Sequence, residues 1–399
     1  MRTLLTGCGT IATGDRVAPL ATGNSVRIED GRISAVGAVP DEGADLVYDL
    51  GGATLIPGLI DAHSHPVLGD YTPRQQALGW TGRMPHGGVT TLISAGETHW
   101  PGRQKDGAEA AAICRAAYLS SRGRAADAPR VFGGALLLDA GITEADIDAL
   151  HASGVRLLGE IGLGSEKRVE RIAELVAHAK NLGWVAPLHY GGASVPGSSV
   201  VGLDMATAVQ PTVISHANGG PTARPLEEVL ELIDHTDCAI EIVFAGNMRA
   251  AAAIVAHLAG RAELHRLQLG TDTPSGTGVV PLGMLRLLTE LAAATGIAPE
   301  ELLCAATGDT AARYGLSAAE PGQRGESGHA SSDLGRIVPG AVADLVVLDA
   351  PLGAELPDAF SAMRAGNVPA VAGVFIDGVL AVGKSVATPP PLRALGLAG

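Results

Sequence analysis

Between residues 55 and 280, short apolar runs rich in β-branched residues alternate with longer stretches rich in Ala, Leu, Glu and Arg. The longer stretches, for example 166–182, 226–234 and 248–258, are typical of amphipathic helices, and the short runs are typical of buried strands. This alternation predicts repeated βα units around a parallel sheet. The predicted strands are 55–65, 89–96, 131–139, 155–162, 184–191, 212–219, 239–246 and 267–273.

The number and spacing of these units indicate the fold. Eight βα units over about 250 residues match a (β/α)8 TIM barrel. An open doubly wound sheet more often carries a Gly-rich phosphate-binding turn after its first strand, whereas here the first predicted strand runs into Pro66. We therefore expect an α/β chain whose barrel domain spans residues 57–333.

The two ends of the chain have a different pattern. Residues 26–36 and 373–382 alternate apolar and polar side chains around Asp30-Gly31 and Asp377-Gly378, and Asp-Gly between such runs is a strong signal for a tight β-hairpin. A further strand is predicted over 343–348. We expect residues 1–56 and 334–399 to form one small β-sandwich without chemistry of its own, reached from the barrel through a Gly- and Ser-rich loop at 318–332.

Composition narrows the classes of partner. The chain has 399 residues, 46% of them hydrophobic, and a formal net charge of −14 without a run of Lys or Arg, so a nucleic-acid or anionic-membrane surface is not expected. Its four cysteines show no CxxC spacing, which argues against a cysteine metal site. No signal-peptide pattern and no apolar stretch of about 20 residues is present, so we expect a cytoplasmic protein.

His63 and His65 end the first predicted strand. Side chains at i and i+2 of a strand point to the same face, so both imidazoles can bind one metal ion. Taken alone, the motif could equally be two hydrogen-bonded histidines. However, further residues that can bind metal stand at the ends of later predicted strands. A parallel barrel carries its catalytic residues at these carboxyl ends. The further residues are Glu160, His189, His216 and Asp272.

Two of these residues carry further expectations. Glu160 lies in an apolar run, where an unpaired carboxylate would cost several kcal/mol, so a metal partner is favoured over a solvated strand end. Asp272 ends the eighth predicted strand and faces the same mouth as the first. It is therefore expected both to bind metal and to accept a proton from water, which makes it the predicted catalytic residue.

Together these residues resemble the amidohydrolase superfamily of metal-dependent hydrolases. The resemblance rests on the order His63-X-His65, Glu160, His189, His216 and Asp272, and on the segments 57–65, 87–91 and 335–347. It covers essentially the whole chain. It implies a barrel that holds two divalent ions, either zinc alone or a zinc–iron pair.

One departure from the superfamily pattern points to a narrower group. Many binuclear members carry a carbamylated lysine at the fourth strand, where this chain has Glu160; Lys167 lies beyond the strand. A glutamate at this place is similar to enamidases, as are segments 216–220 and 270–278. The resemblance implies hydrolysis of a C–N bond in a small cyclic amide or enamide of the 6-oxo-tetrahydronicotinate type.

The implied mechanism follows from charge. Two ions bridged by Glu160 would lower the pKa of a water molecule, the resulting hydroxide would attack the amide carbon, and Asp272 would pass the proton to the leaving nitrogen. Hydroxyl, amide and imidazole groups near the mouth are predicted to orient the ring, or else to support the metal ligands. These substrate-binding candidates are Tyr190, Asn218, Thr273, Ser275 and His99.

Two alternatives stay open at this point. A deaminase of the same fold would need a glutamate just beyond His189, and residues 190–193 contain none. A non-catalytic scaffold with a decayed metal site would not retain two ions. We expect the chain to bind a small-molecule substrate. We also expect it to assemble with copies of itself into a dimer or a tetramer.

Overall fold

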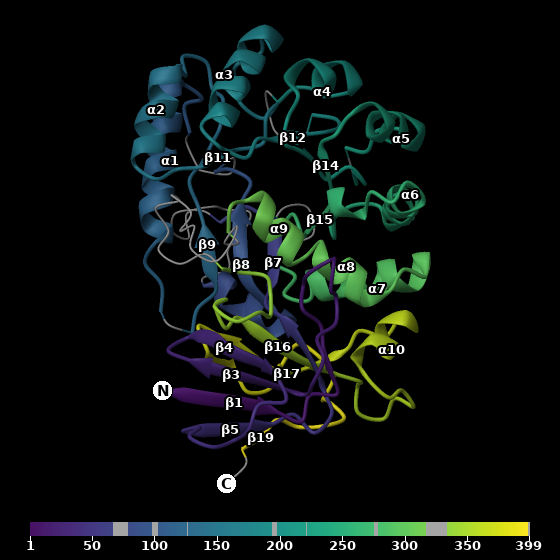
Figure 1. Cartoon of the computed structure of the whole chain (residues 1–399). Helices are drawn as coiled ribbons and strands as arrows, with labels where there is room; N and C mark the ends of the chain where they lie inside the picture. The colour runs from purple at the N-terminus through teal and green to yellow at the C-terminus, as the bar shows by residue number, and fades with distance from the viewer. Residues whose placement is uncertain are drawn as a thin grey trace.

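The computed structural model describes residues 1–66, 79–97, 103–125, 127–193, 198–220, 222–274, 278–316 and 333–397. The middle of the chain forms parallel strands with helices outside them, and both ends of the chain lie together at one side of the molecule (Figure 1). The expected α/β class is therefore confirmed. His99, Ser275 and the loop predicted at 318–332 lie outside the described residues.

The parallel strands follow one another in space in sequence order. Three hydrogen-bonded groups are formed, and the bridge between Leu157 and Val185 joins the second group to the third. The groups are β7 (Leu59–Ser64), β8 (Val89–Ser94) and β9 (Arg130–Phe132); β10 (Ala135–Leu136) and β11 (Leu157–Leu158); and β12 (Pro187–His189), β13 (Val213–Ser215), β14 (Ala239–Val243) and β15 (Leu267–Gly270).

The first and last of these strands meet at their carboxyl ends. The Asp272 amide donates to the His63 carbonyl at 2.9 Å, and the His65 amide donates to the Thr273 carbonyl at 2.8 Å. Nearer the amino ends, the carbonyls of residues 305 and 306 accept hydrogen bonds from β15 and β7 instead. The direct contact thus lies where the predicted ligands lie.

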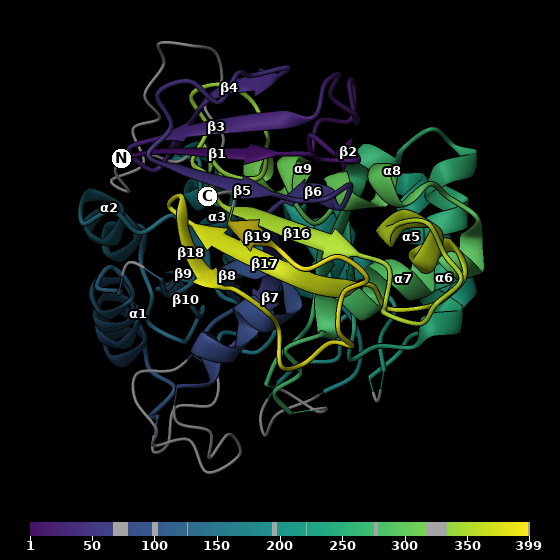
Figure 2. The ribbon, with the colours of Figure 1, turned by 90° about the horizontal axis from the view of Figure 1, so that it is seen from below.

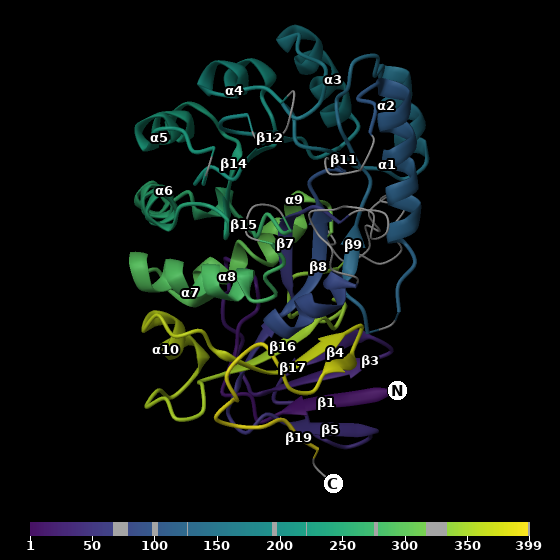
Figure 3. The same ribbon diagram turned by 180° about the vertical axis from the view of Figure 1, so that it is seen from behind.

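Helices surround these strands on the outside (Figure 3). Those predicted over 166–182, 226–234 and 248–258 are present within a few residues, and their apolar faces share one buried cluster with the strands. The helices are α1 (Gly107–Ser121), α2 (Glu144–Ala152), α3 (Val169–Asn181), α4 (Leu203–Val209), α5 (Leu226–His235), α6 (Met248–Gly260), α7 (Gly283–Thr295), α8 (Pro299–Cys304) and α9 (Gly308–Arg313), with 3₁₀ helices η1 (Trp80–Gly87) and η2 (Leu264–Arg266).

The chain ends build two five-stranded sheets whose strands lie together (Figure 2). Leu5 and Val26 of one sheet share a buried cluster with Val347 and Phe375 of the other. One sheet has the order β19 (Gly396–Leu397), β5 (Leu46–Asp49), β1 (Arg2–Thr6), β3 (Ser25–Glu29), β4 (Arg32–Gly37). The second has the order β18 (Val379–Val382), β17 (Ala370–Ile376), β16 (Leu345–Asp349), β6 (Thr54–Pro57), β2 (Thr10–Ile11), and α10 (Ala359–Arg364) connects two of its strands.

Both predicted hairpins are confirmed, β3–β4 and β17–β18. Asp30 and Gly31 have φ of 48° and 79°, and Asp377 and Gly378 have φ of 49° and 74°. Positive φ at both central residues is what a type I′ turn requires.

Two of the eight predicted parallel strands are each divided in the structure, and the other six are shorter than predicted. The run 55–65 is divided at Gly58 into β6 and β7, because the Gly58 amide donates to Asp344 in the terminal part and the next amide, Leu59, donates to Gly88 before β8. The run 131–139 is broken at residues 133–134, where Gly134 adopts φ of 83° against Tyr118. No helix in the described part of the chain is both long and apolar enough to cross a membrane.

Candidate metal centre

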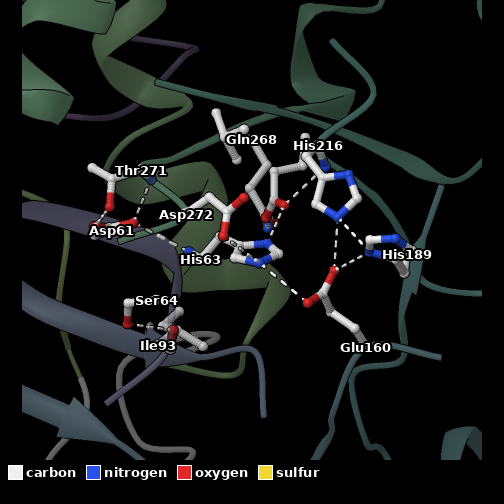
Figure 4. A network of polar contacts seen from close by, with 12 residues as sticks. Asp61, His63, Ser64, Ile93, Glu160, His189, His216, Gln268, Thr271 and Asp272 are labelled. Carbon is white, nitrogen blue, oxygen red and sulfur yellow. Dashed lines mark hydrogen bonds and ion pairs between the residues drawn. The ribbon is translucent and has the colours of Figure 1, made fainter. Parts of the chain in front are cut away.

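The carboxyl ends of the parallel strands bring all six predicted ligands together. Figure 4 labels five of them, and His65 lies beside His63 and Asp272. Most of these side chains are buried, although 20% of the Asp272 side chain is exposed. They lie within β7 or β12, or within two residues after β7, β11, β13 or β15, and they are His63, His65, Glu160, His189, His216 and Asp272.

Glu160 lies at the middle of this group. Its Oε1 is 2.8 Å from His216 Nε2 and 3.1 Å from His189 Nδ1. Its Oε2 is 3.6 Å from His63 Nε2 and 3.7 Å from His65 Nε2. Each carboxylate oxygen therefore faces a different pair of imidazoles, which is the arrangement a bridging ligand needs.

Two sets of ligand atoms each lie within 4.8 Å of one another: His63, Glu160 and His216, and His63, His65 and Asp272. His63 Nε2 is buried and has no hydrogen-bond partner among the described residues. A buried polar atom without a partner is costly and needs an explanation. Imidazole nitrogens and carboxylate oxygens suit divalent transition metals such as zinc or iron, so the donor set fits such ions.

Local backbone strain aims two of these side chains. His216 and Asp272 have φ of 42° and 58°, in the left-handed region that non-glycine residues seldom occupy. Asp61 accepts hydrogen bonds from the Thr271 amide at 2.8 Å and from its hydroxyl at 2.5 Å, which holds the chain just before Asp272. Strain of this kind persists where the surrounding structure imposes it, commonly at functional sites.

The charges of the metal-free cluster compensate one another. Burial alone would lower the pKa of His63, but Glu241 and Glu160 raise it well above its ordinary value. Burial would raise the pKa of Glu160, yet the surrounding histidines hold it well below its ordinary value. The carboxylates thus favour the protonated form of His63, and a metal ion that binds its Nε2 has to displace a proton held there.

Glu241 was missed by the sequence reasoning. It lies within β14, and its Oε1 accepts from His63 Nδ1 at 2.6 Å. The available signal was a carboxylate between Ile240 and Ile242 in an apolar run, the same signal that singled out Glu160.

The described substrate-binding candidates have their polar groups engaged within the protein. Asn218 bonds the Val243 amide and carbonyl, each at 2.9 Å. The Thr273 hydroxyl donates to the Gly278 carbonyl at 3.1 Å, and the Tyr190 hydroxyl donates to Glu228 at 2.7 Å. These contacts are the ones expected if the three residues support the segments that carry the ligands, which is the second of the two roles predicted for them.

Comparison with known proteins identifies the family. No family model matches the chain. A curated enamidase from Eubacterium barkeri is 40% identical over 396 residues, 98% of this chain and 98% of that protein. The chain belongs to the enamidase family. The crystal structure of an enamidase, a member of the amidohydrolase superfamily, matches with a TM-score of 0.91 at 39% identity and covers 100% of both chains.

The resemblance to enamidases expected from the sequence is thus confirmed. A more distant match is the β-aspartyl dipeptidase of Fervidobacterium islandicum, with a TM-score of 0.65 at 16% identity over 97% of this chain and 98% of that chain. At this identity the similarity concerns the fold alone.

Proposed function

We propose that this member of the enamidase family hydrolyses the ring amide of a small cyclic enamide of the 6-oxo-tetrahydronicotinate type. The observation that carries the proposal is Glu160, whose two oxygens face different histidine pairs at the strand ends of a chain 40% identical to an enamidase. Glu160 would bridge two divalent ions, zinc or a zinc–iron pair. One ion would be shared by His63, His65 and Asp272, and the other would be held by His189 and His216.

Divalent ions at such a centre lower the pKa of water and polarise a carbonyl oxygen. The residues of the chain perform the proton transfers. Asp272 accepts a proton from the attacking water and delivers it to the ring nitrogen, while the C–N bond breaks and the carbonyl carbon becomes a carboxylate. Its 20% exposed side chain lets it reach both partners, whereas Glu160 is only 3% exposed and serves as a ligand.

We also propose a complete fold around this site. The contact of β15 with β7 supports eight parallel strands closed into a (β/α)8 barrel over residues 57–333. The shared core of the terminal sheets supports a β-sandwich formed by residues 1–56 and 334–399. We propose a cytoplasmic homo-oligomer, a dimer or a tetramer.

Metal analysis and a substrate panel test this function. The purified protein is expected to hold about two ions per chain and to cleave 6-oxo-tetrahydronicotinate in preference to lactams, cyclic imides and hydantoins. His63→Ala should lose metal and turnover, whereas His178→Ala, which alters a histidine on the outer surface of α3, should keep both. Unchanged turnover in His63→Ala would overturn the site, ammonia release from an amidine would indicate a deaminase, and a metal-free inactive protein would indicate a scaffold.

A further inference from the structure

A buried chain of polar side chains leads away from His63. Glu241 Oε1 accepts from His63 Nδ1 at 2.6 Å, and Glu241 Oε2 accepts from Gln268 Nε2 at 2.7 Å. Gln268 Oε1 in turn accepts from Arg313 Nη1 at 3.1 Å. Glu241 is 1% exposed and Gln268 is fully buried, so these contacts do not compete with solvent.

Each hydrogen bond in this series can run in only one direction, from one donor to one acceptor. Rotating the Gln268 amide by half a turn would set its oxygen against the Glu241 carboxylate and its NH₂ against the Arg313 guanidinium. The donors of Gln268 therefore face Glu241 Oε2, and the backbone amide of His216 donates to Glu241 Oε1, so both oxygens of this side chain are acceptors. Glu241 consequently requires the proton of His63 on Nδ1, which leaves Nε2 to face Glu160 and Asp272.

Glu241 also reaches the second histidine pair. The same Oε1 accepts from the backbone amide of His216 at 3.2 Å, and His216 is one of the two predicted ligands with positive φ. One carboxylate thus fixes the ring of His63 and the strained backbone of His216. These two residues belong to different halves of the candidate centre.

We propose that Glu241, itself held by Gln268 and Arg313, is a positioning residue that fixes the tautomer and ring orientation of His63 and the backbone of His216. It thereby sets the affinity of the centre for its ions. This inference rests on the proposed function, since it needs the two-metal centre. Removing such an outer partner of a ligating histidine typically costs 10–100-fold in metal affinity.

An exchange of two side chains tests the direction of the hydrogen bonds. Glu241→Gln keeps the shape but places an NH₂ group against either Gln268 Nε2 or His63 Nδ1, so metal affinity should fall about 10–100-fold. In the double variant E241Q/Q268E, the amide introduced at position 241 can accept from His63 and donate to the carboxylate introduced at position 268. That carboxylate can in turn pair with Arg313. The double variant should therefore recover most of the lost affinity.

The readouts are metal affinity by competition with a chromophoric chelator and the visible spectrum of the cobalt-substituted protein, with the thermal midpoint recorded alongside. A lower thermal midpoint of Glu241→Gln with unchanged affinity and cobalt spectrum would overturn the inference, because it would show a merely structural role. A double variant no better than Glu241→Gln would also overturn it. Wild-type protein that bound no metal would instead overturn the proposed function, so the two failures are distinguishable.

Discussion

Asp272 differs from the other candidate ligands in its access to solvent. Its Oδ1 lies 3.4 Å from His65 Nε2, yet 20% of the side chain is exposed while that of His65 is 4% exposed. A ligand that borders both the metal site and the open mouth can exchange protons with a substrate. Of the two candidate carboxylate ligands, Glu160 makes the shorter contact with a histidine, 2.8 Å to His216 Nε2, and Asp272 is the more exposed. We therefore propose Asp272 for the proton transfer.

Replacing Asp272 by Asn should separate these two tasks. The amide oxygen can still contact a metal, but the proton acceptor is gone, so kcat should fall by about 10²–10⁴ while much of the metal stays bound. Steady-state kinetics combined with metal analysis of the same preparation checks this. A near-normal kcat at full metal occupancy would show that another group takes the proton.

Glu97, after β8, gives a pH-dependent stability. It is 2% exposed, its Oε1 accepts from the Ser94 hydroxyl at 3.2 Å, and its Oε2 has no hydrogen-bond partner in the described part of the chain. Burial raises the pKa of Glu97 from 4.5 to about 7, despite the opposing influence of His65. The folded protein therefore holds this proton more tightly than the unfolded chain does.

Because the folded-state pKa of Glu97 is raised, its ionisation disfavours folding as the pH rises from about 4.5 to 7. Glu97→Gln removes this cost. In the metal-free protein, the difference in free energy of unfolding between Glu97→Gln and the wild type should therefore grow in favour of the variant through this range. It should reach up to about 3 kcal/mol at pH 8. Urea denaturation at pH 5 and pH 8 measures the difference. For the exposed Glu231→Gln control, the same two measurements should show no such change.

At the scale of elements, Asn218 ties the segment after β13 to the end of β14. Asn218→Ala would leave the buried Val243 amide and carbonyl without these partners, which costs about 1–3 kcal/mol of stability. KM at saturating metal should stay near the wild-type value, because both polar atoms of the side chain already face the backbone. A large rise in KM with unchanged stability would assign Asn218 to substrate binding instead.

Element order was predictable from the sequence, whereas element boundaries and hydrogen-bond partners were not. The parallel strands and the ligands at their ends follow from local periodicity, which each segment carries by itself. The division at Gly58 depends on Asp344, which lies far along the chain and cannot be seen in a continuous apolar run. Tyr190 directly follows His189, the last residue of β12, so the two side chains point to opposite faces. The Tyr190 hydroxyl donates to Glu228, a partner on another element that the local sequence does not reveal.

At the scale of the whole molecule, Arg130 joins the parallel strands to the terminal sheets. From β9 it forms ion pairs with Asp344, just before β16, and with Asp377 in the β17–β18 turn. The Asp344 side chain is 3% exposed, and burial raises its pKa even though Arg130 opposes the rise. Arg130 is therefore the main compensation for a buried carboxylate.

Arg130→Met should lower the free energy of unfolding by about 3–5 kcal/mol, the typical cost of leaving a buried charge unpaired. Chemical denaturation of the metal-free protein measures this loss. The double variant R130M/D344N should recover part of it, because the uncompensated charge is gone. Arg124→Met is the matched control with a smaller expected effect, since its partner Asp377 is 35% exposed and keeps Arg130. Equal losses in both single variants would contradict this account.

The division at Gly58 also limits how the protein could be cut or rearranged. A single residue separates β6 from β7, the strand that carries His63 and leads directly into His65. Among the described residues, β6 pairs only with strands from the two ends of the chain. Gly58 has no room for a side chain, since a Cβ would lie 2.1 Å from the Thr90 hydroxyl oxygen. A fragment trimmed to residues 57–333 would lose the pairing that anchors its first strand. Minimal versions of this enzyme therefore have to carry both tails, and a circular permutant that joins them should tolerate new ends on the surface far better than a deletion would.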